Sequence, residues 1–139
     1  MPIIIRLLNA GLIGFAGAAT MAAMSQGFPD PAMIIAAFVG AALMGIITAP
    51  LFGHPHGDGS AYAIGGALVA TIGGAALAGL VVGLPIGFPG AVLMAPVFVG
   101  AEIIRSPITA ATWIASMALT HAVMWLARSL WQHPAYSRK

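Results

Sequence analysis

Long apolar runs separated by short polar stretches form the main pattern along this chain. Residues 3–25 and 31–52 are two such runs, and each has about the 20 residues that an α-helix needs to cross ~30 Å of hydrocarbon. A third run begins after Ser60 and ends before a turn at residues 85–90, and the last run covers residues 107–132. The pattern predicts an all-α membrane protein.

A further run, residues 91–104, is short for a crossing and contains Pro96. Two arrangements fit it. It is either a full but broken span, or a half-helix that enters the membrane and turns back, which requires its backbone to be buried in protein. We favour the full span, because the sequence repeat described below makes this run the counterpart of residues 31–52. The prediction is therefore about five transmembrane helices, one of them re-entrant in the alternative.

Capping residues and prolines indicate where the helices start and stop. Asp30 and Ser106 each precede a proline, which combines an N-capping side chain with the residue best suited to the first helical position. Pro50 is expected to kink or end the second helix. Residues 53–60 form a polar loop rich in glycine and proline.

The first part of the chain repeats at an offset of sixty residues. The Gly-Phe-Pro turn at residues 27–29 and the Phe-Val-Gly-Ala segment at residues 38–41 both return at this offset. Residues 1–44 give thirteen identities, where so biased a composition gives about four by chance. The alternative is a coincidental likeness between Gly- and Ala-rich helices. We predict one membrane domain, residues 1–139, built from a tandem two-helix repeat and a C-terminal helix. Its parts are residues 1–52, residues 61–105 and residues 107–132.

Small residues recur every four positions in the first and third predicted helices. Such stripes let membrane helices approach closely, which favours van der Waals packing where no hydrophobic effect drives association. A Gly-xxx-Gly pair continues the stripe in the third helix. The predicted helix-packing residues are Gly14, Ala18, Gly66, Ala70, Gly74, Ala78, Gly79 and Gly83.

Composition narrows the class of protein further. The chain is 60% hydrophobic and 6% charged with a mean hydropathy of +1.02, which is typical of an integral membrane protein. It has no cysteine, so thiolate chemistry is excluded. A net charge of +2 without a basic stripe gives no reason to expect nucleic acid as a partner. The carboxylates are dispersed and no catalytic motif is present, so we do not expect an enzyme.

Parity of the helices predicts the topology. With five spans, the N-terminus lies on the same face as the polar loop, and both Gly-Phe-Pro turns lie on the other face with the C-terminus. His54 and His56 would then lie opposite Lys139. Three basic residues on the C-terminal face outnumber two on the other, which places the C-terminus in the cytoplasm by the positive-inside rule. We expect a multi-pass protein of the bacterial cytoplasmic membrane.

Two polar groups of residues are candidates for ion binding. Glu102 and Arg105 are three apart and can neutralise each other on one helix face. Alternatively, Glu102 carries an ion or a proton, since a carboxylate at membrane depth is costly and often functional. His54, His56 and Asp58 could contact a divalent metal, but two imidazoles on one loop make a weak site, and we predict a solvated loop and no metal.

His121 lies near the middle of the last helix and is a candidate cofactor ligand. A mid-membrane imidazole can bind the metal of a tetrapyrrole. His121 followed by Trp125, Arg128 and Trp131 resembles the end of a bacterial light-harvesting polypeptide over about one helix, although Met117 stands where that family has a small residue. The resemblance implies a tetrapyrrole at His121. The residues themselves require no cofactor, and the alternative is a histidine that is hydrogen-bonded within the bundle.

Two classes of function follow from these features. The first is a non-enzymatic small polytopic membrane subunit that packs within a larger membrane complex, of energy-transducing or photosynthetic type, or against copies of itself. Small-residue stripes on a chain with almost no mass outside its helices suggest it. The second is a small transporter or channel using Glu102 and the helices broken by glycine and proline, since transporters bind substrates between repeats. We favour the first, with lipid and other membrane subunits or further copies of the chain as partners.

Overall fold

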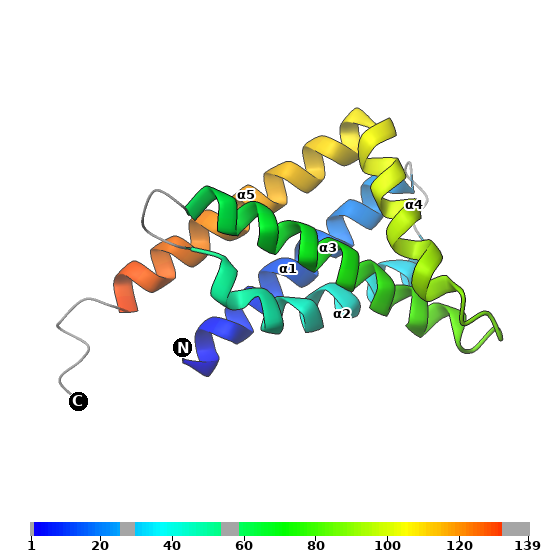
Figure 1. Ribbon diagram of the computed structural model, residues 1–139, viewed down its shortest axis with the longest axis horizontal. Coiled ribbons are helices and arrows are strands. Elements are labelled where there is room, and N and C mark those ends of the chain that lie inside the picture. Colours follow the sequence, from blue (N-terminus) through cyan, green and yellow to red (C-terminus); the bar gives the residue numbers. More distant parts are fainter. Residues whose placement is uncertain (1, 26–29, 54–58, 132–139) are drawn as a thin grey trace.

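The computed structural model describes residues 2–25, 30–53 and 59–131, and these are almost entirely helical (Figure 1). The elements are α1 (Ile3–Met24), α2 (Pro31–Thr48), the 3-10 helix η1 (Ala49–Leu51), α3 (Gly59–Gly83), α4 (Ala91–Arg105) and α5 (Pro107–Trp131). No strand occurs in the described ranges, so the predicted all-α class is confirmed. His54, His56, Asp58 and Lys139 lie outside the described residues.

Side-chain caps fix the starts of α2 and α5. Asp30 Oδ1 accepts a hydrogen bond of 2.9 Å from the backbone N–H of Ala32. Ser106 Oγ accepts one of 3.3 Å from the N–H of Thr109. Each cap satisfies an N–H group that the first turn of a helix leaves without a partner.

The ends of α2 and α3 have different causes. Pro50 has no N–H for the carbonyl four residues before it, and the chain tightens there from α2 into η1. After α3, Gly87 adopts a φ of 71°. Its N–H donates to the Leu84 carbonyl at 3.1 Å, and the Phe88 N–H donates to the Gly83 carbonyl at 2.8 Å. This is a Schellman-type helix stop, so the second Gly-Phe-Pro turn ends a helix because glycine tolerates the left-handed conformation.

The helices form a ring. Each helix packs against the next one in sequence, and α5 packs back against α1. α1 and α3 lie across the ring from each other and make little contact. In Figure 1, α1, α2, α3 and α5 run between the two ends of the molecule, whereas α4 lies across one end.

Four helical segments are long and apolar enough to cross a membrane, and α4 is not one of them. They are Ile3–Met24, Pro31–Leu51, Ser60–Gly83 and Pro107–Trp131. α4 has 15 residues. At ~1.5 Å per residue it measures about 22 Å, which is less than ~30 Å of hydrocarbon. The chain is therefore a helical membrane protein with four candidate spans, and the fifth span that we favoured is not among them.

α5 returns to the end of the ring where α1 begins and α2 ends (Figure 1). Its Arg128 donates a hydrogen bond of 2.7 Å to the Ala49 carbonyl, which directly follows α2. The predicted topology put the end of the last helix opposite the polar loop. That prediction is wrong for the segments flanking the loop, because α4 turns across one end of the ring and leaves α5 to cross back.

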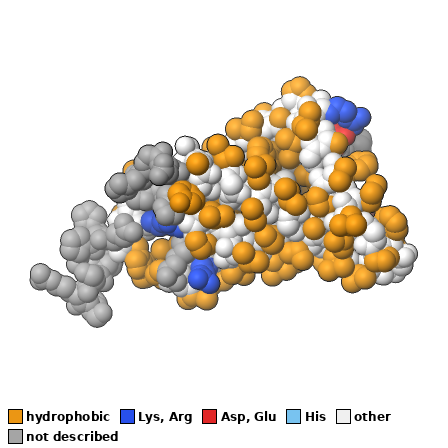
Figure 2. Space-filling model, viewed as in Figure 1, with side chains coloured by type: hydrophobic (Ala, Val, Ile, Leu, Met, Phe, Trp, Pro, Cys, Tyr) orange, Lys and Arg blue, Asp and Glu red, His pale blue; other side chains and the backbone are white. Residues whose placement is uncertain are grey.

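The core is small and the outer surface is apolar. Ile13, Phe52 and Met124 are fully buried and belong to one cluster with small side chains such as Ala16 and Ala70. Figure 2 shows apolar side chains over most of the visible face, with basic side chains toward its two ends. Such a surface suits contact with lipid, since exposed apolar area of this extent is rare on soluble monomers.

Candidate functional site

Gly14 of α1 and Gly74 of α3 both lie against α2. A Cβ atom added to Gly14 would be 3.0 Å from the Phe38 ring of α2. A Cβ atom added to Gly74 would be 2.9 Å from the Cα atom of Ala41, also in α2. Carbon atoms attract best at ~3.5–4.0 Å. A side chain at Gly74 would therefore press on the backbone of α2, whereas one at Gly14 would require the Phe38 ring to shift.

Most of the other predicted packing residues also lie between helices. Gly79 and Gly83 face Ala91 at the start of α4, and Gly66 faces Leu51 and Phe52. Ala18 is half-buried. The remaining members of the predicted set are buried in α3. They are Ala70 and Ala78.

A cavity of about 90 Å³ occupies the interior of the ring. All five α-helices contribute to its wall, and it is partly open to its surroundings. Apolar side chains dominate the wall, and none of the described residues that line it is charged. Its polar lining side chains are Thr20, Thr71 and Trp113.

A hydrogen bond joins α3 and α5 at this cavity. Trp113 Nε1 donates to Thr71 Oγ1 at 2.8 Å, and the Thr71 hydroxyl donates to the Ala67 carbonyl at 2.7 Å. The bond matters for the fold, because it ties together helices that are not neighbours in the ring. Sequence analysis missed it, since no spacing rule relates two residues 42 positions apart.

A second polar junction connects α5 to the end of α2. His121 Nδ1 accepts a hydrogen bond of 3.2 Å from the Gly53 N–H, and Arg128 Nη2 binds the Ala49 carbonyl. The last carbonyls of a helix lack intrahelical partners and carry partial negative charge, so a guanidinium is a favourable donor there. Gly53 has a φ of 73°, and a Cβ atom on it would lie 2.6 Å from the Met124 backbone. Only glycine fits this position.

The hydrogen bond to Gly53 bears on the cofactor hypothesis for His121. Because Nδ1 accepts the hydrogen bond from Gly53, the neutral imidazole carries its own hydrogen on Nε2. Neither nitrogen then keeps a free lone pair for a metal. A tetrapyrrole at His121 would have to break the bond to Gly53, and such binding stays a prediction from the resemblance alone.

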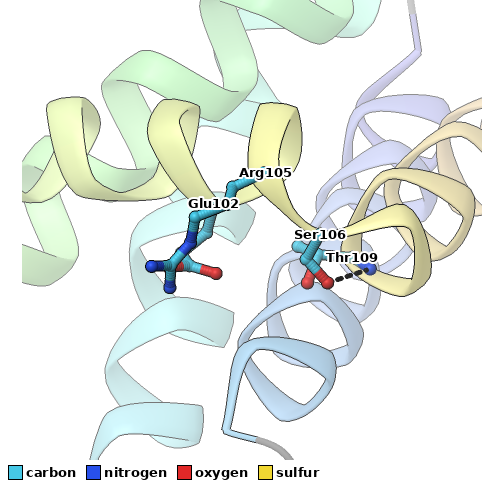
Figure 3. A network of polar contacts seen from close by, with 4 residues as sticks. All are labelled: Glu102, Arg105, Ser106 and Thr109. Atoms are coloured by element: carbon cyan, nitrogen blue, oxygen red, sulfur yellow. Dashed lines mark hydrogen bonds and ion pairs between the residues drawn. The ribbon is translucent and has the colours of Figure 1, made fainter.

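Glu102 and Arg105 form an ion pair at the end of α4. Figure 3 shows the two side chains together near the end of α4, with Ser106 and Thr109 beyond them at the corner where the chain turns into α5. The Glu102 side chain is 13% exposed and that of Arg105 is 76% exposed. Neither residue lines the cavity. An ion pair this exposed on one side contributes about 0–1 kcal/mol to stability.

Asn9 is a buried polar residue that sequence analysis did not single out. Its Nδ2 donates a hydrogen bond of 2.7 Å to the Gly45 carbonyl of α2, and the residue has no exposed surface. A Cβ atom on Gly45 would lie 2.7 Å from Ala10 Cα, so α1 and α2 nearly touch here. The sequence did contain a signal for this buried contact, because Asn9 is a lone amide in an apolar run.

The described residues hold no obvious metal centre. Within residues 2–25, 30–53 and 59–131 there is no group of three or more His, Cys, Asp or Glu side chains that could hold a metal ion. Comparisons with protein-family models, curated proteins and solved structures gave no match.

Proposed function

We propose that the protein is a non-enzymatic, multi-pass membrane subunit that docks onto other membrane helices through α5. The observation that carries this proposal is how little of α5 the rest of the chain covers. Only 11% of its most apolar window is buried, against 39% for α1, 39% for α2 with η1, and 33% for α3. About half of the residues of α5 are exposed, and these face either lipid or another protein.

Small side chains on the uncovered face of α5 favour another protein. The exposed alanines are Ala111, Ala115, Ala118 and Ala122. Their spacing of four, three and four puts them in one stripe along the helix. Flanking residues such as Ile114 and Leu119 are large and more than half exposed. Lipid contact does not require an alanine stripe, whereas close approach of a second helix does.

The partner that we favour is a helix of a different membrane subunit. Most of the described chain is membrane-length helix, and the cavity inside the ring carries no charge among its described lining residues. Such a chain acts most directly as part of a larger assembly, of which energy-transducing and photosynthetic complexes are examples. A second copy of the chain is the other arrangement, and the experiments below distinguish the two.

The distribution of basic residues supports a cytoplasmic location for both ends of the described chain. Arg6 is in the first turns of α1, and Arg128 is near the end of α5. Arg138 and Lys139 follow α5 within eight residues, whereas Arg105 ends α4 at the opposite end of the ring. Among the described residues, Arg6 and Arg128 thus belong to one end and Arg105 to the other, and Arg138 and Lys139 follow Arg128 in the sequence. The positive-inside rule assigns the end with Arg6 and Arg128 to the cytoplasm. We place the protein in the bacterial cytoplasmic membrane in this orientation.

The alternative of a transporter or channel has weaker support. A transport site would need polar or ionisable groups facing a path through the protein. Glu102 is instead paired with Arg105 and lies outside the cavity. Both hydroxyl groups that line the cavity already donate to backbone carbonyls of their own helices.

Purification from native membranes in a mild detergent tests the proposal. We expect a second membrane protein to co-purify with the wild-type chain and to be lost in Ala115→Trp, which places a large ring on the alanine stripe. Leu68→Trp is the matched control, because Leu68 is 48% exposed on α3, away from the stripe. A wild-type protein that purifies alone and monomeric contradicts the proposal. Absorbance of the same sample reports any tetrapyrrole.

A further inference from the structure

The cavity inside the ring is confined to one half of the bundle. It is lined by the later part of α1, the early part of α2, the later part of α3, and residues from α4 and the first half of α5. Each of the four helices other than α5 contributes lining residues, for example Thr20 from α1, Met33 from α2, Val82 from α3 and Val99 from α4. The cavity is therefore at the depth of a single leaflet, on the side where α4 lies.

Water is a poor occupant for this space. A volume of about 90 Å³ has room for roughly six to nine waters at ~10–15 Å³ each, and each water needs two to four polar partners. The Thr20 hydroxyl donates to the Ala16 carbonyl, and the Thr71 hydroxyl donates to the Ala67 carbonyl. Trp113 uses its only donor on Thr71. The wall thus offers almost no free hydrogen-bonding groups.

The wall is suited to a flexible hydrocarbon chain. Four methionines line the cavity, and the unbranched methionine side chain adapts to occupants of changing shape. They are Met21, Met24, Met33 and Met117. The cavity is partly open, and the packing of α4 against α5 is the loosest between neighbours in the ring. No residue of α4 is fully buried. α4 and α5 are therefore the neighbouring helices that separate most easily.

We propose that this cavity binds one acyl chain of a membrane lipid, which enters from the leaflet on the α4 side between α4 and α5. The bilayer supplies such chains at the same depth and at high concentration. A methylene group is similar in size to a water molecule, so the space accommodates several methylenes of one chain. The lipid would act as a structural element that fills the ring.

The test uses the purified full-length protein in vesicles of phosphatidylethanolamine and phosphatidylglycerol. A trace of phosphatidylcholine carries a photoactivatable diazirine on one acyl chain, and peptide mass spectrometry maps the labelled residues. We expect labelling of Met24 and Trp113 inside the ring as well as labelling of the outer surface. Val82→Phe, which fills the cavity, should reduce the interior labelling severalfold. Val81→Phe, one position away and 50% exposed on the outside, should leave it unchanged.

A second pair of variants guards against misfolding of the first. Val99→Phe fills the cavity from α4, and Val97→Phe adds the same ring to an outward position that is 68% exposed. Interior residues that remain unlabelled in the wild-type protein would overturn the proposal. So would interior labelling that persists in both cavity-filling variants. Recovery of a bound isoprenoid that displaces the diazirine lipid would also overturn the assignment to an acyl chain.

Discussion

Three glycines of α3 provide a graded test of the helix packing. A Cβ atom on Gly65 would meet nothing within 4 Å. The three atoms nearest to one on Gly73 would all belong to the Met44 side chain, whose terminal methyl is 2.6 Å away and can move. One on Gly74 would meet the α2 backbone at Ala41 Cα, 2.9 Å away. Replacing each glycine by alanine applies the same chemical change to three different surroundings.

The expected magnitudes follow from these surroundings. Alanine is favoured over glycine in a helix by about 0.8–1 kcal/mol, so Gly65→Ala should be neutral or stabilising. For Gly74→Ala, the contact must open by about 0.6–1.1 Å to reach the ~3.5–4.0 Å at which carbon atoms attract. A gap of that size along the α2–α3 contact forfeits a quarter to a half of the local van der Waals attraction. Overpacking of this kind typically costs about 1–3 kcal/mol. The effect of Gly73→Ala on stability should lie between those of Gly65→Ala and Gly74→Ala.

Thermal unfolding in a mild detergent, followed by circular dichroism, measures the series. The order of midpoints should be Gly65→Ala at or above wild type, then Gly73→Ala, then Gly74→Ala. If Gly74→Ala is as stable as Gly65→Ala, α2 and α3 do not approach each other as described. Gly74→Leu should be more damaging still, and also more damaging than Leu77→Ala in the same helix.

Three further predictions concern polar residues. Glu102→Gln should change the free energy of unfolding by no more than about 1 kcal/mol and produce no change in proton flux in vesicles; flux that depends on Glu102 would favour a transporter. His121→Leu leaves the Gly53 N–H without its acceptor and should cost about 1–3 kcal/mol in stability, with no loss of visible absorbance; a lost absorbance band would instead indicate a pigment. Trp113→Phe and Thr71→Val should be non-additive in a double-mutant cycle of unfolding free energies, and additivity would contradict their hydrogen bond.

Local features of the fold were predictable because they depend on residues close in sequence. The Asp30 and Ser106 caps follow from side chains that reach backbone groups two or three residues away. Apolar run length identified the four long helices. The stripe containing Gly74 predicted a close approach, because an i, i+4 pattern fixes one face of a helix.

The path of α4 could not be derived in this way. Its 15 residues fit a strained span or a helix lying across one end, and apolarity does not decide between them. Packing between helices decides the path of α4, since Gly79 and Gly83 let the start of α4 lie against the end of α3. Counting α4 as a full span also gave α5 the wrong direction, because the direction of each helix was assigned by counting the spans before it. Arg128 and its acceptor are 79 residues apart, which no local pattern relates.

The alanine stripe of α5 should contact another protein in the native membrane. Photo-crosslinking in native membranes tests it directly, with the crosslinking amino acid benzoylphenylalanine placed at Ala115 or, as a control, at Leu68. We predict a discrete protein adduct from position 115 and only lipid adducts from position 68, and the mass of the adduct distinguishes another subunit from a second copy of the chain. Lipid adducts alone from both positions would contradict the claim.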